Sequence, residues 1–431
     1  MGIVIGILIL SLLMIVHELG HFLMGRALKF RIEEFSIFMG PKLFSWTRKE
    51  IVYSVRLFPI GAFVRFAGEE DRTVDDPGTF FHRPRWARAL VIGAGPLVNL
   101  MAGLLSFLIL FSMVGFFTPY IAAPAAGSQA AAAGLAAGDR VLSVNGDALW
   151  ATMDYDVENG FVANTAAVSL RVRPADGSAV RTVNLVPLKQ NGYRLGITTQ
   201  GASVDGGLLV LSVDAASNGG SPVLLKDDVL LSVDGVSASD RTALTAAVNA
   251  AGADKEMTVV VKRADVETTL TMKALSYEFV NDRGVSFTGG HGFFGAIGAA
   301  VKSSGSVVKL TFHSLSMLFS GAIKPQDALS GPVGIVDTIG GIVAQNQPFG
   351  VTASTLLLIF ALISVNLGIF NLLPIPALDG SQLVLICVEA VRGGKRLPEK
   401  VENTIVAVGF FLIIALAVVG LVFDVMRIVN R

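Results

Sequence analysis

The chain contains 431 residues, of which 52% are hydrophobic and only 16% are charged, and its mean hydropathy is +0.63. This composition is too apolar for a soluble protein of that length, so it favours a membrane protein. The formal net charge of zero gives no electrostatic reason to expect nucleic acid or an acidic substrate as a partner. The single cysteine, Cys387, excludes an intramolecular disulfide.

Four segments are long and apolar enough to cross a bilayer, which takes about 20 residues. They are Gly2–Met24, Ala87–Phe117, Thr352–Leu373 and Ile405–Phe423. The first segment lacks a basic N-terminal region and a small-residue cleavage site, so we expect a retained span rather than a signal peptide. We therefore expect a polytopic α-helical membrane protein with four transmembrane helices.

Basic residues gather in two of the loops between these segments. Because cytoplasmic loops carry an excess of Lys and Arg, both loops are expected on the cytoplasmic side and both termini outside. The long segment that follows the second span is then extracytoplasmic. The first loop contains Arg26, Lys29, Arg31, Lys42, Arg48, Lys49, Arg56, Arg65, Arg72, Arg83 and Arg85, and the third contains Arg392, Lys395, Arg396 and Lys400.

The long extracytoplasmic segment contains an internal repeat. "GLAAGDRVLSVNG" (Gly134–Gly146) aligns without gaps with "VLLKDDVLLSVDG" (Val223–Gly235), at an offset of 89 residues. In each copy a short β run ends in an Asn-Gly or Asp-Gly pair, which is a hairpin signal. A helical patch (Thr242–Ala251) and a strand (Met257–Arg263) follow in the second copy. Two domains of the same β-rich fold are therefore expected.

The first copy resembles a PDZ domain of the bacterial protease type, whose "AGLxxGDxIxxING" loop it nearly reproduces. The second copy departs from this pattern at Val223 and Asp227, which replace two glycines, so it could be a spacer with the same fold. The alternative is a generic pair of β-rich domains.

Two histidines and a glutamate interrupt the first apolar segment, in "LLMIVHELGHFLMG" (Leu12–Gly25). His17 and His21 are four residues apart on a helix, so their imidazoles project from one face, and Glu18 lies beside them. This H-E-x-x-H spacing is typical of zinc proteases, in which the Glu is the general base. The alternative is a pair of hydrogen-bonded core histidines. Inside a membrane span a bound metal accounts better for buried imidazoles, so zinc is the expected cofactor.

A catalytic zinc needs a third protein ligand from another part of the chain. His82, His291 and His313 qualify by residue type. However, His82 belongs to a basic loop, and the other two are expected on the opposite side of the membrane from His17 and His21.

The better candidate for the third ligand lies in "NLLPIPALDG" (Asn371–Gly380), which closes the third span. Pro374 and Pro376 cannot sustain a helix, and freed backbone groups at membrane depth are tolerated only where protein or a water cavity lines them. Asp379 would then lie on the same side of the membrane as the histidines. The alternative is an ordinary turn at a helix end.

The pairing of "HELGH" with "NLLPIPALDG" resembles the site-2 protease family of intramembrane zinc metalloproteases, and the PDZ-like domains point to the bacterial branch typified by the regulator of sigma-E protease, RseP. "GAGPLVN" (Gly93–Asn99) and "SGPVGI" (Ser330–Ile335) also look like family motifs. By this resemblance, His17, His21 and Asp379 would bind zinc and Glu18 would be the catalytic base. Asn371 would contact the substrate.

The resemblance also implies the biological role. The enzyme would hydrolyse peptide bonds within or near transmembrane segments of single-span proteins, such as anti-sigma factors or remnant signal peptides, in the bacterial inner membrane. An upstream site-1 protease could act first on the same substrate. The PDZ-like domains would admit only substrates whose outer domain has been shortened.

Two further segments are expected to serve this role. The run from Lys49 to Phe66 alternates like a strand and is broken at Pro59 and Gly61, which fits a re-entrant β-structure that an unwound substrate could extend; a solvated hairpin is the alternative. The run from Phe293 to Phe319 fits a helix on the membrane surface or, equally, a helix that packs between domains.

The expected organisation follows from these arguments. It comprises transmembrane helix 1 (1–24), a cytoplasmic-side segment with the re-entrant hairpin (25–86), transmembrane helix 2 (87–117), two PDZ-like domains (118–199 and 200–276), an interfacial helix and loop (277–351), transmembrane helix 3 (352–380), a cytoplasmic-side loop (381–404) and transmembrane helix 4 (405–431).

A membrane scaffold and a transporter are the two alternatives to a protease. A membrane scaffold could use tandem PDZ-like domains but has no use for His17, Glu18 and His21 inside a span. A transporter would carry inverted repeats within the membrane, whereas the repeat found here is extramembrane.

Overall fold

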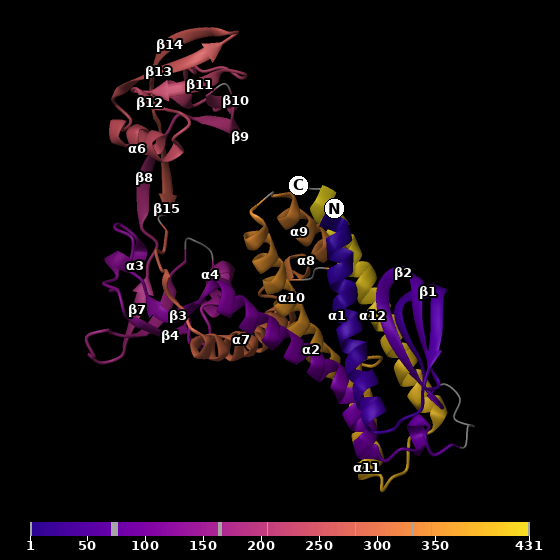
Figure 1. The fold of residues 1–431 in the computed structure, drawn as a ribbon. Coiled ribbons are helices and arrows are strands. Elements are labelled where there is room, and N and C mark those ends of the chain that lie inside the picture. Colours follow the sequence, from indigo (N-terminus) through magenta and orange to yellow (C-terminus); the bar gives the residue numbers. More distant parts are fainter. Residues whose placement is uncertain are drawn as a thin grey trace. The chain divides into compact units, whose positions relative to one another are not determined.

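The computed structural model describes residues 2–69, 76–162, 166–204, 206–280, 282–328, 331–345 and 347–429 (Figure 1). Arg72 and Ser330, singled out above, lie outside these ranges. The chain divides into two compact units. The first comprises Met1–Pro119, Ala148–Glu158 and Phe287–Arg431, and the second comprises Tyr120–Asp147 and Asn159–Ser286.

The first unit is mainly helical. Among the residues that the structure describes, four helices are long and apolar enough to cross a membrane: α1 (Gly2–Ala27), α2 (Arg85–Val114), α10 (Phe349–Leu372) and α12 (Glu399–Val429). They coincide with the four expected spans. The second ends earlier than expected because Gly115, with a φ of 86°, terminates α2 and Phe116 begins strand β3 (Phe116–Ile121).

Small residues allow α1 and α2 to approach closely. A Cβ atom at Gly20 would lie 2.5 Å from the carbonyl oxygen of Ala94. On the other side of α2, a Cβ at Gly103 would lie 2.5 Å from a methyl group of Val365 in α10. Such contacts replace the hydrophobic driving force that is absent between helices in lipid. As a result, α2 is packed between α1 and α10.

The shorter helices of this unit correct two expectations. Residues 381–404 are not a loop throughout, because α11 extends from Asp379 to Val391, and α12 begins at Glu399 rather than at 405. Both helices have acidic residues in the first turn, which the helix dipole stabilises and which hydropathy does not detect. The other helices are η1 (Phe80–His82), α4 (Met153–Phe161), α7 (Phe293–Phe319), α8 (Pro325–Ala328) and α9 (Pro332–Ala344).

The run 293–319 forms the helix α7, as expected. One of its faces is buried, through residues that include Ala300, Ser303 and Val307. Ala300 and Val307 share a hydrophobic cluster with Phe107 of α2 and Val365 of α10. This face of α7 therefore packs against α2 and α10.

Strands β1 (Ile32–Arg48) and β2 (Ile51–Phe66) form a hairpin that is folded over on itself, as Figure 1 shows. Residues 34–37 of β1 pair with 52–55 of β2 and also with 62–65 of the same strand. The bends lie at Phe38 and Gly40 in β1 and at Gly61 in β2, all with positive φ. The hairpin is thus a compact sheet of four arms: 32–39, 42–48, 51–58 and 62–66.

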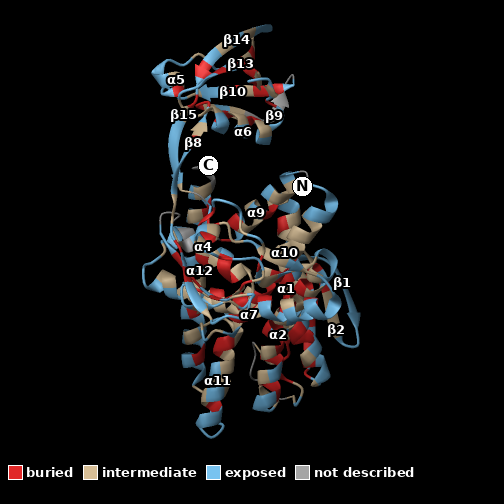
Figure 2. Ribbon diagram, turned by 90° about the vertical axis from the view of Figure 1, so that its left-hand side faces the viewer, coloured by how far each residue is buried: buried red, intermediate tan, exposed pale blue. Residues whose placement is uncertain are grey.

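Two six-stranded sheets and a two-stranded ribbon lie wholly or largely in the second unit. One has the order β14-β13-β11-β10-β9, with β12 beside β11, and its strands carry buried residues, drawn red in Figure 2. The elements here are β9 (Ile197–Val204), β10 (Gly207–Val213), α5 (Ser217–Gly220), β11 (Val229–Val233), β12 (Val236–Ser237), α6 (Arg241–Ala251), β13 (Glu256–Arg263) and β14 (Val266–Lys273).

The other sheet has the order β16-β3-β4-β6-β7, with β5 beside β4. The repeat is visible in the elements, because β4 and β5 correspond to β11 and β12 at the offset of 89 residues. Asn145-Gly146 and Asp234-Gly235 all have positive φ, as a two-residue hairpin turn requires. The remaining elements are α3 (Gln129–Ala132), β4 (Arg140–Val144), β5 (Asp147–Ala148), β6 (Val168–Arg173), β7 (Arg181–Leu185) and β16 (Phe287–Gly290).

The two sheet domains are nested rather than tandem, which differs from the expected bounds 118–199 and 200–276. Strand β8 (Lys189–Arg194) pairs with β15 (Leu275–Val280) in a two-stranded ribbon. This ribbon leads into and out of the inner domain, which contains β9 to β14, whereas the outer domain contains β3 to β7 and β16. The chain then returns to the outer domain, where the Ala122 amide donates to the Ser286 carbonyl (2.9 Å). The last strand of the outer domain is short and has the sequence Phe-Thr-Gly-Gly, so the repeat in the sequence did not indicate it.

Candidate metal centre

Helix α1 brings the two histidines together. His17 and His21 are separated by one turn, and their Nε2 atoms lie 3.2 Å apart, with the rings nearly perpendicular. Both residues are buried. Two imidazole nitrogens that point at the same small volume are the arrangement that a shared metal ion requires.

Asp379 approaches this pair from the break between α10 and α11. Its Oδ2 atom lies 3.1 Å from Nε2 of His17 and 3.5 Å from Nε2 of His21. The break depends on a tight turn, since a Cβ atom at Gly380 would lie 2.1 Å from the carbonyl oxygen of Leu373. Only glycine fits there, so the Asp-Gly sequence is what lets α11 begin beside the histidines.

The three ligand atoms lie within 4.8 Å of one another, a spacing suited to a metal ion. The Oδ2 atom of Asp379 is buried and has no hydrogen-bond partner. A buried carboxylate oxygen without a partner is costly, and a cation between the three side chains would satisfy it. Two imidazoles and one carboxylate, with a fourth position left for water, are a donor set that catalytic zinc uses.

The other ring nitrogen of each histidine also has a partner. Nδ1 of His21 lies 2.8 Å from the Val91 carbonyl oxygen, which can only accept, so this nitrogen carries the proton and Nε2 is left for a metal. Nδ1 of His17 lies 3.2 Å from the side-chain nitrogen of Asn99. The Oδ1 atom of Asn99 is buried without a partner. Turning this amide by 180° would let Oδ1 accept a hydrogen bond from Nδ1 of His17. The turn would remove the contact between two nitrogen atoms and would give the buried Oδ1 atom a partner.

Glu18 points toward the folded hairpin. Its carboxylate accepts a hydrogen bond from the backbone amide of Val64 at 3.1 Å. Val64 belongs to the arm 62–66, whose other side pairs with residues of β1. The outer edge of that arm therefore lies along the helix that carries His17 and Glu18.

Asn371 lies in the last turn of α10, and its side-chain nitrogen is 3.5 Å from Nδ1 of His17. The other histidines are elsewhere. His82 contacts the Thr79 hydroxyl at 2.7 Å, and Nε2 of His313 lies 3.4 Å from Glu158. His291 adjoins Gly115. Among the described residues, the cluster around His17 includes Asp379 and none of these three.

Asn99, Gly95 and the Val91 carbonyl have no role that was predicted from the sequence. All three belong to α2, and two of them fall in "GAGPLVN". A Cβ atom at Gly95 would lie 2.3 Å from Nε2 of His21, so this glycine makes room for the imidazole. The sequence signal for Asn99 is a polar residue inside an apolar span, where an amide is costly unless it has a partner. In the structure Asn99 is fully buried.

Comparisons with known proteins give the family. Residues 5–416 match the description "Peptidase family M50". The chain belongs to this family, that of the site-2 proteases. A "Putative zinc metalloprotease" of Thermotoga maritima is 30% identical, over 96% of this chain and 97% of its own. The M50 chain is thus a metalloprotease and a membrane protein.

Other relatives cover the chain as completely. The "Regulator of sigma-E protease RseP" of Salmonella typhimurium is 28% identical, over 98% of each chain. Among solved structures, the HtrA3 PDZ domain bound to a phage-derived ligand is 16% identical, covers 21% of this chain and 92% of its own, and has a TM-score of 0.19.

Proposed function

We propose that this M50 protease is an intramembrane zinc endopeptidase that cuts peptide bonds within or near the transmembrane segments of single-span proteins. The observation that carries the proposal is the cluster of His17, His21 and Asp379, with an unpartnered Asp379 oxygen, on and beside an apolar helix long enough to span a bilayer. Glu18 on the same helix provides the acid–base group that hydrolysis needs.

His17 and His21 would hold the metal through Nε2, and Asp379 through Oδ2. A zinc ion bound there would polarise the scissile carbonyl and acidify the attacking water. Val91 and Asn99 fix the orientation of the two imidazoles, which keeps both Nε2 atoms directed at one point.

Glu18 would accept the proton from the attacking water and return it to the leaving amine. The Val64 amide holds one carboxylate oxygen, and the other oxygen would make this transfer. Asn371, beside His17 at the end of α10, is placed to donate a hydrogen bond to the substrate carbonyl.

A transmembrane helix must unwind before hydrolysis, because its carbonyls are engaged in intrahelical hydrogen bonds. The arm 62–66 offers an edge on which an extended segment could pair, as peptides do when they add to a sheet. The contact between Val64 and Glu18 supports this role, since it puts that edge beside the base.

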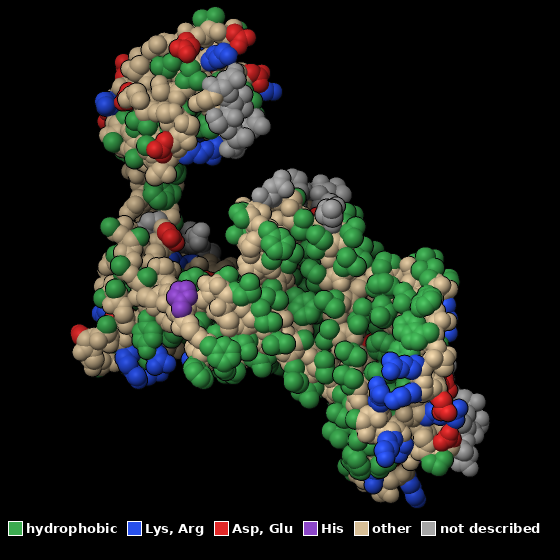
Figure 3. Space-filling model, viewed as in Figure 1, with side chains coloured by type: hydrophobic (Ala, Val, Ile, Leu, Met, Phe, Trp, Pro, Cys, Tyr) green, Lys and Arg blue, Asp and Glu red, His purple; other side chains and the backbone are tan. Residues whose placement is uncertain are grey.

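The orientation and cellular setting are part of the proposal. Lys and Arg side chains gather at one end of the helical unit, next to a broad apolar band (Figure 3). We assign that end to the cytoplasm by the positive-inside rule, with both termini and the nested sheet domains outside, in a bacterial inner membrane. The sheet domains would act as a size filter for substrates, such as anti-sigma factors or remnant signal peptides, that another protease has already shortened.

Metal analysis and cleavage of a panel of doubly tagged single-span reporters test this function. The purified chain should contain one zinc and cut reporters within the apolar segment, as mass spectrometry of the fragments would show. A chain that holds no stoichiometric metal, or whose metal content does not change on His17→Ala, would instead fit a scaffold or a transporter.

A further inference from the structure

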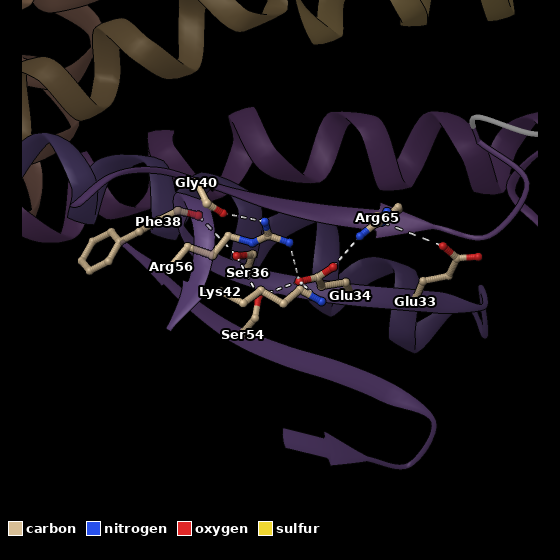
Figure 4. Close-up of polar contacts among 9 residues, drawn as sticks. All are labelled: Glu33, Glu34, Ser36, Phe38, Gly40, Lys42, Ser54, Arg56 and Arg65. Carbon is tan, nitrogen blue, oxygen red and sulfur yellow. Dashed lines mark hydrogen bonds and ion pairs between the residues drawn. The ribbon is translucent and has the colours of Figure 1, made fainter. Parts of the chain in front are cut away.

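A buried carboxylate lies at the centre of the folded hairpin. Glu34, in the arm 32–39, is only 2% exposed. Its Oε1 atom accepts from the Ser54 hydroxyl at 2.6 Å and lies 2.9 Å from Arg56 and 3.2 Å from Lys42. Its Oε2 atom accepts from Arg65. Figure 4 shows these side chains converging on Glu34.

The four partners come from all three other arms of the hairpin. Lys42 belongs to 42–48, Ser54 and Arg56 to 51–58, and Arg65 to 62–66. One carboxylate therefore joins every arm of the sheet. Arg56 adds a second link, since it donates to the Gly40 carbonyl (2.8 Å) at the bend in β1.

The carboxylate is held in its charged form. Burial by itself would raise the pKa of Glu34, but the hydrogen bonds from Ser54, Arg56 and Lys42 lower it to about 2. The neighbouring Glu33 lies at the surface instead. Its side chain is 49% exposed and its carboxylate lies 3.9 Å from Arg65.

The arm that Arg65 anchors is also the arm that holds the base. Val64, the residue before Arg65, donates its amide to Glu18 at 3.1 Å. Across the sheet, Val64 is paired with Phe35, the residue after Glu34. A shift of this arm by one residue would turn its side chains over and remove the amide from Glu18.

We propose that Glu34 is a positioning residue, which clamps the arm 62–66 in the register that directs the Val64 amide at Glu18 and sets the outer edge of the arm along the metal centre. This inference rests on the proposed function of Glu18. Glu34 acts through the backbone and touches neither metal nor substrate. A carboxylate is needed because it accepts from four donors in three directions, whereas a glutamine amide offers one oxygen and no charge.

The test compares Glu34→Gln with Glu33→Gln in the full chain. Glu34→Gln should lower kcat on a cleaved single-span reporter by about 100-fold, the usual effect of misplacing a catalytic group by about 1 Å. Its zinc content should stay the same, because in the described part of the chain no hydrogen bond or ion pair joins His17, His21 or Asp379 to Glu34 or its four partners. Glu33→Gln should stay within about twofold of the wild type, as expected of a surface change. Hydrogen exchange should become faster in residues 62–66 of Glu34→Gln only.

A cross-link separates positioning from general stability. Ile37 and Ala62 are paired Cα neighbours, so Ile37→Cys with Ala62→Cys can form a disulfide across the two arms, in a background with Cys387→Ser. Oxidation should restore kcat to Glu34→Gln, toward that of the oxidised chain that keeps Glu34. Reduction should abolish the rescue.

Three results would overturn the positioning role. They are unchanged kcat in Glu34→Gln, loss of zinc together with activity, and a formed cross-link that restores nothing. A Glu34→Gln chain that folds only when cross-linked would be a fourth contrary result, because it would show that Glu34 acts on stability. A wild-type chain that cleaves no reporter contradicts the proposed function instead, and the exchange rates of 62–66 then still report on the clamp.

Discussion

A Cβ atom at Gly95 would lie 2.3 Å from Nε2 of His21, closer than real Cβ contacts allow. This Nε2 atom belongs to a ring whose other nitrogen is held by the Val91 carbonyl. The imidazole therefore cannot move aside without losing that hydrogen bond. This relationship links the packing of α1 on α2 to the geometry of the metal centre.

The first prediction follows from this contact. Gly95→Ala should lower zinc affinity by roughly 10- to 100-fold, the usual effect of disturbing the surroundings of a ligand. Gly93→Ala is the matched control, because a Cβ atom at Gly93 meets nothing within 4 Å. Competition with a chelator measures both. Equal zinc affinity in the two variants would contradict the steric role of Gly95.

The second prediction concerns the base. Glu18→Gln should keep its zinc but lose about 100- to 10,000-fold in cleavage rate, because an amide cannot accept the proton. His17→Ala and His21→Ala should lose both zinc and activity. Near wild-type cleavage by Glu18→Gln would remove Glu18 from the mechanism.

The third prediction concerns Asp379. Asp379→Ala should weaken zinc binding and abolish cleavage, since two histidines alone leave the metal with too few ligands. Asp379→Glu should retain part of both. Stoichiometric zinc and normal turnover in Asp379→Ala would mean that the third ligand is elsewhere.

How much of this could be predicted from the sequence depends on the range of the interactions. The four spans could be predicted because bilayer insertion is decided by local hydropathy. His17, Glu18, His21 and Asp379 could be proposed as a site because their spacing and the Pro-interrupted span are local signals. The roles of Asn99 and Gly95 could not, since they depend on which face of α2 meets α1.

The nested order of the two sheet domains could not be predicted from the sequence either, because it also depends on contacts between distant residues. The repeat at Gly134–Gly146 and Val223–Gly235 indicated two similar sheets, but strand order is set by pairing between distant residues. After the inner domain the chain returns through β15 to β16, which pairs with β3 at the edge of the outer sheet. Similarly, α11 begins at a proline-rich turn and has a polar first turn, so hydropathy does not predict it.

The fourth prediction concerns the inner sheet domain. Asp228 is buried, and its carboxylate accepts from Arg263 twice at 2.8 Å and from the Leu225 amide at 2.8 Å. Burial by itself raises the pKa of Asp228, but these donors lower it below its ordinary value. A lowered pKa in the folded state adds stability above the unfolded pKa of about 3.9, and this stability is lost as pH falls through the folded pKa.

Asp228→Asn should therefore destabilise the inner sheet by about 1–3 kcal/mol at pH 7, and the difference from the wild type should vanish in acid. Asp227→Asn, at the exposed neighbouring position, is the control. Hydrogen exchange of the β11 and β13 amides, corrected for the intrinsic rate at each pH, measures the difference. A gap that persists in acid would show that the ion pair is not its cause.

The last prediction uses the nested topology to test the size filter. Arg194 and Leu275 are paired Cα neighbours at the end of the ribbon, so replacing 195–274 by an Asn-Gly turn removes the inner domain and closes β8 and β15 into a hairpin. The outer domain and the metal centre keep their residues. If the inner domain excludes bulky substrates, the shortened chain should cleave full-length reporters that the wild type rejects, and trimmed reporters equally well. If it recruits substrates by their exposed ends, cleavage of trimmed reporters should slow and full-length ones should stay resistant. Cleavage of both reporters, with membrane insertion and zinc content verified, decides between the two, and continued resistance of the full-length reporter contradicts the filter.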